Sequence, residues 1–391
     1  MIRIVFVDDE VNVLHALRRT MHCMRNDWDM EFLSSGPAAL ESLAKKSAEV
    51  IVSDMRMPGM DGWELLTEVK KLYPQTVRLV LSGYAEPGAI MRLVGTAHQY
   101  IAKPGESEIL KAAIAQTQLV RTLLASDELA LLVGNVGTLP SFPKAFQEIS
   151  SCLKRPNATA SDAARIISRD VAMTANVMKL VNSAFFGARR PVTNVDRAVA
   201  YLGLDTLTAL VLGYGLFQST DSSEAEALWQ HSLRTAMVAR SIALHEQLPA
   251  SRSEEAFLAG MLHDVGRVVF ATRNPAASPA QRRQEETALI DEHHATVGAY
   301  LMGIWGLPSH IVAAIALHHS PSRRADRGLD LTVLVHIANR LAHWQGKGRL
   351  DSKELGIEPG ILEELGIAHR LADWSASVHD SPCRSSEMKD A

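Results

Sequence analysis

Acidic side chains end two apolar segments within the first sixty residues, in positions where they could take up a phosphoryl group. Asp8 and Asp9 end the run IRIVFVDDE, and Asp54 lies at the end of EVIVSDM. Both runs are apolar and β-branched, which is typical of buried strands. Clustered carboxylates attract a hard cation such as Mg²⁺, and a carboxylate screened by that ion can attack a phosphodonor and become an aspartyl phosphate.

Two further residues would complete this chemistry. Ser82 ends the run TVRLVLS, and Lys103 follows the run HQYIA. A lysine ammonium supplies a point charge to phosphoryl oxygens, and a serine hydroxyl supplies a donor. Because parallel strands end at one edge of a sheet, the pattern predicts an open, doubly wound α/β sheet with its site at the carboxyl edge. Acids also end strands simply as turn residues, but five chemically matched positions disfavour that interpretation.

These motifs closely resemble those of response-regulator receiver domains, over residues 1 to about 120. The resemblance implies a flavodoxin-like fold and a sensor histidine kinase as phosphodonor. It assigns a role to each matched residue: Asp54 accepts the phosphoryl group, Asp8, Asp9, Asp54 and the Arg56 backbone carbonyl bind Mg²⁺, Lys103 contacts the phosphoryl oxygens, and Ser82 with Tyr100 forms a switch pair. Taken alone, Tyr100 would be an ordinary core residue.

The composition indicates two domains and limits the classes of partner. The chain has 391 residues, 47% of them apolar, which suffices for two packed cores. Its net charge of −4 disfavours nucleic acid as a partner. The start becomes acidic too soon for a signal peptide and no long apolar run suggests a membrane span, so we expect a soluble cytoplasmic protein. The three cysteines match neither a disulfide framework nor a zinc knuckle.

A domain boundary is expected between about Leu124 and Leu139. Apolar residues at helical spacing predict one helix from Ser107 to Ser126, about 30 Å long, before GNVGTLPSFP breaks the pattern. The remainder favours helices, with a sharp corner near Asp170 and a helix start at Ser161 or Asp162. We therefore divide the chain into an α/β receiver at 1–120, a helical linker at 121–138, an all-helical domain at 139–350, and a C-terminal helix with a disordered tail at 351–391.

Histidines in the helical half form a candidate site for a divalent transition metal such as Mn, Fe, Zn or Ni. Ligands on several helices of a bundle can meet in its interior. Spacing alone is weak support, since a single helical histidine is more often a hydrogen-bonded core or surface residue. The candidate ligands are His231, His263, Asp264, His294, His318 and His319.

The helical half, from about Leu139 to about Trp344, resembles the HD superfamily of metal-dependent phosphohydrolases, most closely its HDOD branch of regulatory output domains. The segments that carry the resemblance are NSAFFG, YLGLDTL, LWQHSLRTA, AFLAGMLHDVGR, HATVGAYLMGIWGLP and LHHSP. That branch is generally regarded as non-enzymatic, which implies output through contacts with other signalling proteins. Asn339 stands where active HD enzymes place a closing Asp, and SPSRR in place of a GYP motif follows His319. Both departures disfavour hydrolysis.

Two functional hypotheses follow. In the first, phosphorylation of Asp54 turns Tyr100 inward, and the linker helix transmits the change to a non-catalytic output domain that binds an unidentified signalling protein. In the second, the helical domain is a receiver-gated, metal-dependent phosphohydrolase in which Arg267 contacts substrate phosphate, although a surface or salt-bridging Arg267 is the preferred interpretation. We favour the first. Neither DNA nor a membrane is expected as a partner, whereas the resemblance to response regulators implies dimerisation through the receiver or the linker helix.

Overall fold

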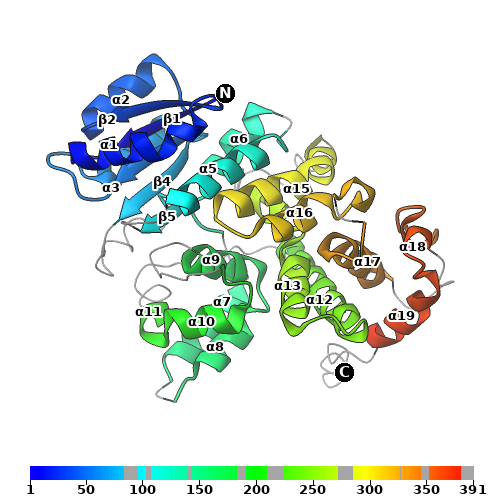
Figure 1. Ribbon diagram of the computed structural model, residues 1–391. Coiled ribbons are helices and arrows are strands. Elements are labelled where there is room, and N and C mark those ends of the chain that lie inside the picture. The colour runs from blue at the N-terminus through cyan, green and yellow to red at the C-terminus, as the bar shows by residue number, and fades with distance from the viewer. Residues whose placement is uncertain are drawn as a thin grey trace.

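A parallel sheet flanked by helices packs against a larger helical region (Figure 1). The structure is a computed structural model. It describes residues 1–82, 95–102, 107–124, 126–139, 143–155, 157–182, 191–208, 223–271, 285–325, 327–344 and 352–379.

The sheet has five parallel strands in the order β2-β1-β3-β4-β5. They are β1 (Ile2–Val7), β2 (Trp28–Leu33), β3 (Val50–Asp54), β4 (Val77–Ser82) and β5 (Gln99–Ala102). This doubly wound, flavodoxin-like order confirms the predicted fold class. β2 was not among the four runs identified from the sequence. It is an edge strand in which only Trp28 is fully buried, so WDMEFL lacks the apolar run of a central strand.

The helices of this domain are α1 (Val11–Thr20), the short η1 (Met21–Met24), α2 (Gly36–Lys45), α3 (Gly62–Leu72) and α5 (Ser107–Arg121). α3 starts close to the carboxyl end of β3 because Asp61 and Glu64 form a capping box and Gly62 has no side chain. A Cβ on Gly62 would lie 2.1 Å from the Asp54 carbonyl oxygen. The glycine therefore permits the backbone approach that brings α3 beside Asp54.

The predicted continuous helix from Ser107 to Ser126 is wrong. α5 ends at Arg121, and α6 (Asp127–Gly134) begins after a turn. The cause is local: the Ser126 hydroxyl accepts a hydrogen bond from the Leu129 N–H at 3.3 Å, and acidic residues fill the first turn of α6. A new helix start therefore competes successfully with extension of α5.

The rest of the described chain contains only helices and their connections. The helices are α7 (Pro143–Leu153), α8 (Ala160–Ile167), α9 (Val171–Val181), α10 (Val195–Leu202), α11 (Leu204–Thr208), α12 (Ser223–His245), α13 (Ala250–Leu262), α14 (Val265–Ala271), α15 (Glu285–Ile304), α16 (Ser309–Leu317), η4 (Pro321–Arg323), α17 (Leu331–His343), α18 (Ile361–Glu364), η5 (Ala368–Arg370) and α19 (Leu371–His379). The predicted corner is confirmed, since the Asp170 carboxylate caps α9. The cap of α8, predicted at Ser161 or Asp162, is two or three residues late, because Thr159 is the cap.

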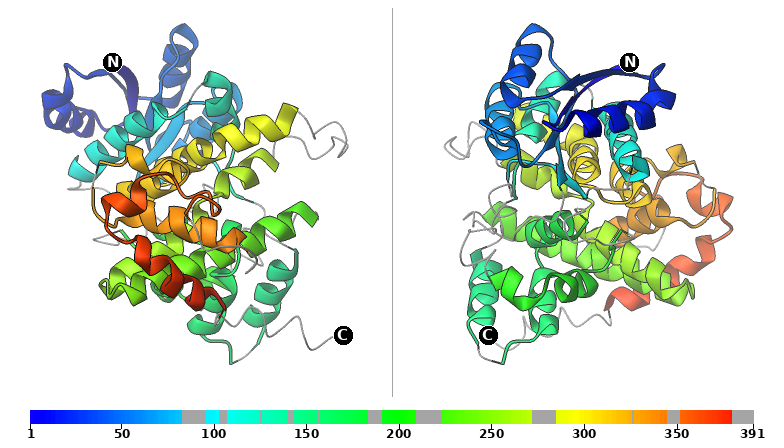
Figure 2. Two further views of the ribbon diagram at one scale, coloured as in Figure 1. Left: turned by 90° about the vertical axis from the view of Figure 1, so that its right-hand side faces the viewer. Right: turned by 60° about the vertical axis from the view of Figure 1, so that its left-hand side comes forward.

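The two halves share buried apolar contacts. One continuous cluster runs from Ile4 in β1 to Trp374 in α19, and a smaller cluster covers the other face of the sheet. α5 lies between the sheet and α15 in Figure 1, and the turned views of Figure 2 show the same contact. Among the helices that the structure describes, none is long and apolar enough to cross a membrane. The polar tail predicted to be disordered starts at Ser375, and this prediction is wrong for its first residues, because α19 continues as a helix to His379 and Ser375 is buried. The tail beyond residue 379 lies outside the described residues.

Candidate functional site

The acidic residues predicted at the sheet meet at its carboxyl edge. Asp8 follows β1 and Asp54 ends β3, and these two strands are paired. Asp8 is 1% exposed and Asp54 is 8% exposed, whereas Asp9 is half-buried. The Glu10 N–H donates to Asp8 Oδ1 at 3.0 Å, and the Arg56 N–H donates to Asp54 Oδ2 at 2.7 Å. Two buried carboxylates with a third beside them form a donor set suited to a hard cation such as Mg²⁺.

The other predicted receiver residues are placed only in part. Ser82 ends β4 beside Ala102 of β5, but its side chain lies outside the description, as does all of Lys103. Tyr100, on β5, is 4% exposed, and no described residue forms a hydrogen bond with its hydroxyl. Burial raises the pKa of Tyr100 well above its usual value. The ring is thus turned into the core in this structure.

All six candidate ligands of the helical region converge. They form two groups that share Asp264, and within each group the ligand atoms lie within 4.8 Å of one another. α12 contributes His231, the junction of α13 and α14 contributes His263 and Asp264, α15 contributes His294, and the residues after α16 are His318 and His319. We call these six residues the His–Asp cluster. The spacing alone did not establish this convergence.

Hydrogen bonds define which ring nitrogen of the central histidines faces the cluster. Nδ1 of His263, His294 and His318 each lies 2.7 to 2.8 Å from a backbone carbonyl about one turn earlier. A carbonyl only accepts, so these Nδ1 atoms carry the proton in a neutral ring and Nε2 presents its lone pair. The same backbone or carboxylate hydrogen bond orients histidines that bind metals.

The Nε2 atoms approach one another and the Asp264 carboxylate. The His231–His263 and His294–His319 Nε2 pairs are 3.3 and 2.9 Å apart, and His294 Nε2 lies 3.1 Å from Asp264 Oδ1. Ligands at about 2.0 to 2.1 Å from one ion are separated by roughly 2.8 to 3.4 Å in octahedral or tetrahedral geometry. The His318 Nε2 atom is buried and has no hydrogen-bond partner among the described residues. The donor set therefore fits a divalent transition metal.

The electrostatics of the His–Asp cluster favour neutral imidazoles around an ionised carboxylate. Burial lowers the pKa of His318 well below its usual value, and it lowers that of His231 to about 3 and that of His319 to about 4. Burial alone would raise the pKa of Asp264, but the neighbouring His263 and His294 lower it well below its ordinary value. These are the protonation states that a metal requires of its ligands.

Comparison with protein families identifies both halves. Residues 4–115 match the response regulator receiver domain, and residues 139–321 match the HDOD domain. The chain is a response regulator. Its HDOD domain contains the His–Asp cluster described above, and its receiver domain contains the paired carboxylates. The predicted family is confirmed on both counts.

Similar proteins match the response regulator over parts of their own length. An uncharacterized protein of Treponema pallidum is 30% identical over 223 residues, which cover 54% of this chain and 43% of the relative. The hydrogenase transcriptional regulatory protein HoxA of Cupriavidus necator is 40% identical over 107 residues, 26% of this chain and 21% of HoxA. The chain therefore spans less than half of the length of these curated relatives.

Two solved structures resemble parts of this chain. The MmoQ response regulator of Methylococcus capsulatus has a TM-score of 0.48 and 23% identity, and the match covers 62% of this chain and 98% of MmoQ. The receiver domain of an HD domain-containing protein from Pseudomonas fluorescens Pf-5 has a TM-score of 0.28 and 26% identity, and it covers 29% of this chain and 91% of that one.

Around the His–Asp cluster, the structure confirms the preferred interpretation of Arg267 and adds one residue, His343. Arg267 is a salt-bridging residue, as preferred from the sequence: its Nε lies 3.2 Å from Asp264 Oδ2 and its Nη2 lies 2.9 Å from Asp291 Oδ1. His343 was not predicted. Its ring lies 4.2 Å from the ring of His231, and its Nδ1 donates to the Asn339 carbonyl at 2.9 Å. The one-turn spacing from Asn339 to His343 was the available signal.

Proposed function

We propose that the response regulator is phosphorylated on Asp54 by a sensor histidine kinase and that this phosphorylation controls the HDOD domain. The paired burial of Asp8 and Asp54 at the carboxyl edge of the sheet carries the proposal. Two buried carboxylates side by side repel each other unless a cation screens them. Asp8, Asp9, Asp54 and the Arg56 carbonyl would hold Mg²⁺, which would offset charge as Asp54 attacks the phosphodonor.

Lys103, Ser82 and Tyr100 would respond to the new phosphoryl group. The Lys103 ammonium would pair with its oxygens and the Ser82 hydroxyl would donate to one of them. Tyr100 belongs to β5, whose Gln99 donates to the Ile304 carbonyl of the HDOD domain, so a change at this strand has a direct route to the output domain.

Two measurements, phosphate incorporation and capture of protein partners, test the proposed role of Asp54. The full chain would be incubated with acetyl phosphate and Mg²⁺ beside Asp54→Asn, and protein partners captured from a lysate of the source cells would be compared between the two. We expect phosphate on the wild-type protein alone, with capture that changes on phosphorylation. Stable phosphate on Asp54→Asn would contradict the site, and capture that is identical in both proteins would contradict control of the output.

We infer further that the HDOD domain holds a divalent transition metal ion in the His–Asp cluster. Five Nε2 atoms and one carboxylate form two groups that share Asp264, with the ligand atoms of each group within 4.8 Å of one another, and the buried His318 Nε2 lacks a hydrogen-bond partner among the described residues. Uncharged imidazoles favour Zn, Ni, Co or Fe over Mg. Metal content per purified chain, measured beside His263→Ala, tests this: metal retained in full by the variant would place the ion elsewhere.

The second candidate function is a receiver-gated, metal-dependent phosphohydrolase, and the converged cluster is the observation that favours it. A bound divalent ion would act as a Lewis acid and lower the pKa of water at the site. Asp264 would hold that ion and Arg267, one-third exposed, would contact an anionic phosphate after leaving Asp291. Asn339, buried and neutral, supplies no closing charge and favours output by protein contact.

Hydrolysis of generic phosphodiesters by the full chain separates the two candidates. Turnover that is lost in Asp264→Ala but retained in Asp54→Asn would assign hydrolysis to the HDOD domain. Turnover that persists in Asp264→Ala would come from a contaminant, and the absence of turnover in a metal-loaded chain would leave protein contact as the output.

A further inference from the structure

The turn between α15 and α16 joins two helices that lead to ligands of the His–Asp cluster. α15 carries His294 and ends at Ile304, and α16 leads from Ser309 to His318 and His319. Gly306 in the turn has φ +85°, a left-handed conformation that ends the helix. The turn therefore determines the angle at which α16 leaves α15.

Two glutamines of the receiver bind this turn. Gln99 Nε2, on β5, donates to the Ile304 carbonyl at 3.0 Å, and Gln116 Nε2, on α5, donates to the Leu307 carbonyl at 2.7 Å. Both also lie within 3.4 Å of the Gly303 carbonyl. The last carbonyls of a helix need partners from outside the helix, and here the receiver supplies them.

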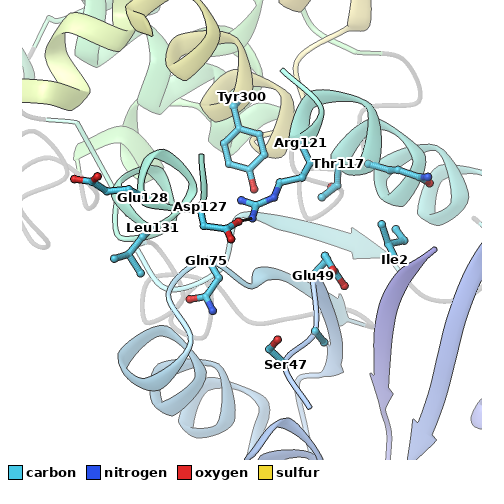
Figure 3. A pocket seen from close by; sticks show the side chains of 12 residues that line it. Ile2, Ser47, Glu49, Gln75, Thr117, Arg121, Asp127, Glu128, Leu131 and Tyr300 are labelled. Atoms are coloured by element: carbon cyan, nitrogen blue, oxygen red, sulfur yellow. Dashed lines mark hydrogen bonds and ion pairs between the residues drawn. The ribbon is translucent and has the colours of Figure 1, made fainter. Parts of the chain in front are cut away.

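Close packing surrounds these hydrogen bonds. A Cβ on Gly303 would lie 2.6 Å from Val120 of α5, so the two helices are in tight contact. Arg121, near the end of α5, lies between Tyr300 of α15 and Asp127 of α6, with its Nη2 2.5 Å from Asp127 Oδ1 (Figure 3). Arg121, Asp127 and Tyr300 line a cavity of about 470 Å³ at the amino edge of the sheet. This edge is opposite the carboxyl edge that carries Asp8. The receiver thus contacts α15 along its last two turns.

We propose that Gln99 and Gln116 are positioning residues of the His–Asp cluster: by binding the α15–α16 turn, the receiver holds His318 and His319 in place relative to His294. This inference rests on the proposed metal site. α16 spans about 14 Å from the turn to His318, so a tilt of about 5° at the turn moves that histidine by roughly 1 Å. Metal–ligand distances tolerate only about 0.2 Å. A small change at the turn therefore removes ligands.

β5 connects Tyr100 of the predicted switch pair with the His–Asp cluster. Gln99 precedes Tyr100 on β5, and their side chains point to opposite faces of the sheet, with Tyr100 in the smaller apolar cluster. A shift of β5 at Tyr100 is transmitted to the α15–α16 turn through one peptide unit.

The test is a cobalt(II) titration of the full chain with the receiver site kept filled by excess Mg²⁺. Gln99→Met and Gln116→Met, singly and together, remove the donors with little change in volume. Gln118→Met is the matched control, because Gln118 also lies half-buried on α5 but accepts from Trp28 Nε1 within the receiver. Nitrogen-ligated cobalt has a visible absorption spectrum that reports the number and arrangement of its ligands.

We expect the double variant to bind cobalt at least about 10-fold more weakly, with an altered spectrum, while Gln118→Met matches the wild type. A helix cap with a purely structural role would lower stability and leave the affinity and spectrum of the folded protein unchanged, and that result overturns the inference while sparing the metal site. A wild-type chain that binds no divalent transition metal overturns both. If the double variant does not fold, the single variants are decided by the same criteria.

Discussion

Gly266 should be the glycine to which the His–Asp cluster is most sensitive. It lies where α14 crosses α15, and a Cβ there would lie 1.9 Å from the His294 carbonyl oxygen, whereas contacts under 3.0 Å essentially do not occur. Both partners are backbone and cannot rotate away, so Gly266→Ala must separate the helices by about 1 Å. Overpacking of this kind costs typically about 1–3 kcal/mol, and contact with backbone favours the upper part of that range.

The same separation acts on the metal ligands. Asp264 lies two residues before Gly266, and its Oδ1 is 3.1 Å from His294 Nε2. An added 1 Å exceeds the tolerance of about 0.2 Å for metal–ligand distances. We therefore expect folded protein that has lost most of its bound metal, as measured by mass spectrometry of metal content beside urea unfolding.

Gly36→Ala is the control, because its added Cβ would meet only the flexible Met60 side chain, whose Sδ is 2.7 Å away. It should retain wild-type metal content and nearly wild-type stability. If Gly266→Ala retains its full metal content, either Asp264 is not a metal ligand or the crossing can relax without moving it, and the reasoning fails.

Three further variants probe charge and packing. Asn339→Asp adds a carboxylate and should strengthen metal binding about 10-fold or more. Repulsion between the new carboxylate and Asp264 should lower the melting temperature of the metal-free protein, and equal changes in the melting temperatures of the metal-free and metal-loaded forms would contradict this. His343→Ala should weaken metal binding by up to about 10-fold by freeing His231, measured by competition with a chromophoric chelator. Burial and the nearby cations lower the pKa of Lys179 to about 7, so unfolding takes up a proton above that pH and stability should rise by up to roughly 1.4 kcal/mol per pH unit from pH 7 to 9. Lys179→Met should flatten that slope in urea unfolding, and an unchanged slope would assign it to other groups.

The receiver could be predicted well because its site lies at strand ends. An apolar run followed by an acid indicates both the strand and its terminus, so Asp8 and Asp54 could be placed at one sheet edge without coordinates. β2 could not be predicted in this way, because an edge strand exposes one side and its polar residues break the apolar run. Likewise, the periodicity predicted that α5 continues beyond its observed end, because Ser126 fits a helical pattern as well as it fits a helix cap.

The His–Asp cluster illustrates a different limit. Residue type and the resemblance to HD proteins named its six members, but periodicity only places a histidine on a face of a helix. Whether the four elements that carry these residues meet depends on packing between distant parts of the chain. Gln99 and Gln116 gave no sequence signal at all. A glutamine is ordinary on a helix or an edge strand, and only the free carbonyls of another domain's turn give it a role.

The two proposed metal sites differ in ligand chemistry, so they should be separable by a chelator. The receiver site offers only oxygen atoms, from Asp8, Asp9, Asp54 and the Arg56 carbonyl, and such sites suit Mg²⁺. The His–Asp cluster offers five imidazole nitrogens and one carboxylate, and such sites suit Zn, Ni, Co or Fe. A chelator with aromatic nitrogen donors, such as phenanthroline, binds these transition ions far better than Mg²⁺. In excess Mg²⁺ it should therefore strip the cluster while Asp54 is still phosphorylated by acetyl phosphate. Parallel measurements of metal content and of phosphate incorporation check this. Loss of the transition metal and of phosphate incorporation together would mean that the two sites do not bind independently. Retention of the transition metal would mean that the chelator cannot reach the cluster and that release of the metal is limited by opening of the α15–α16 turn.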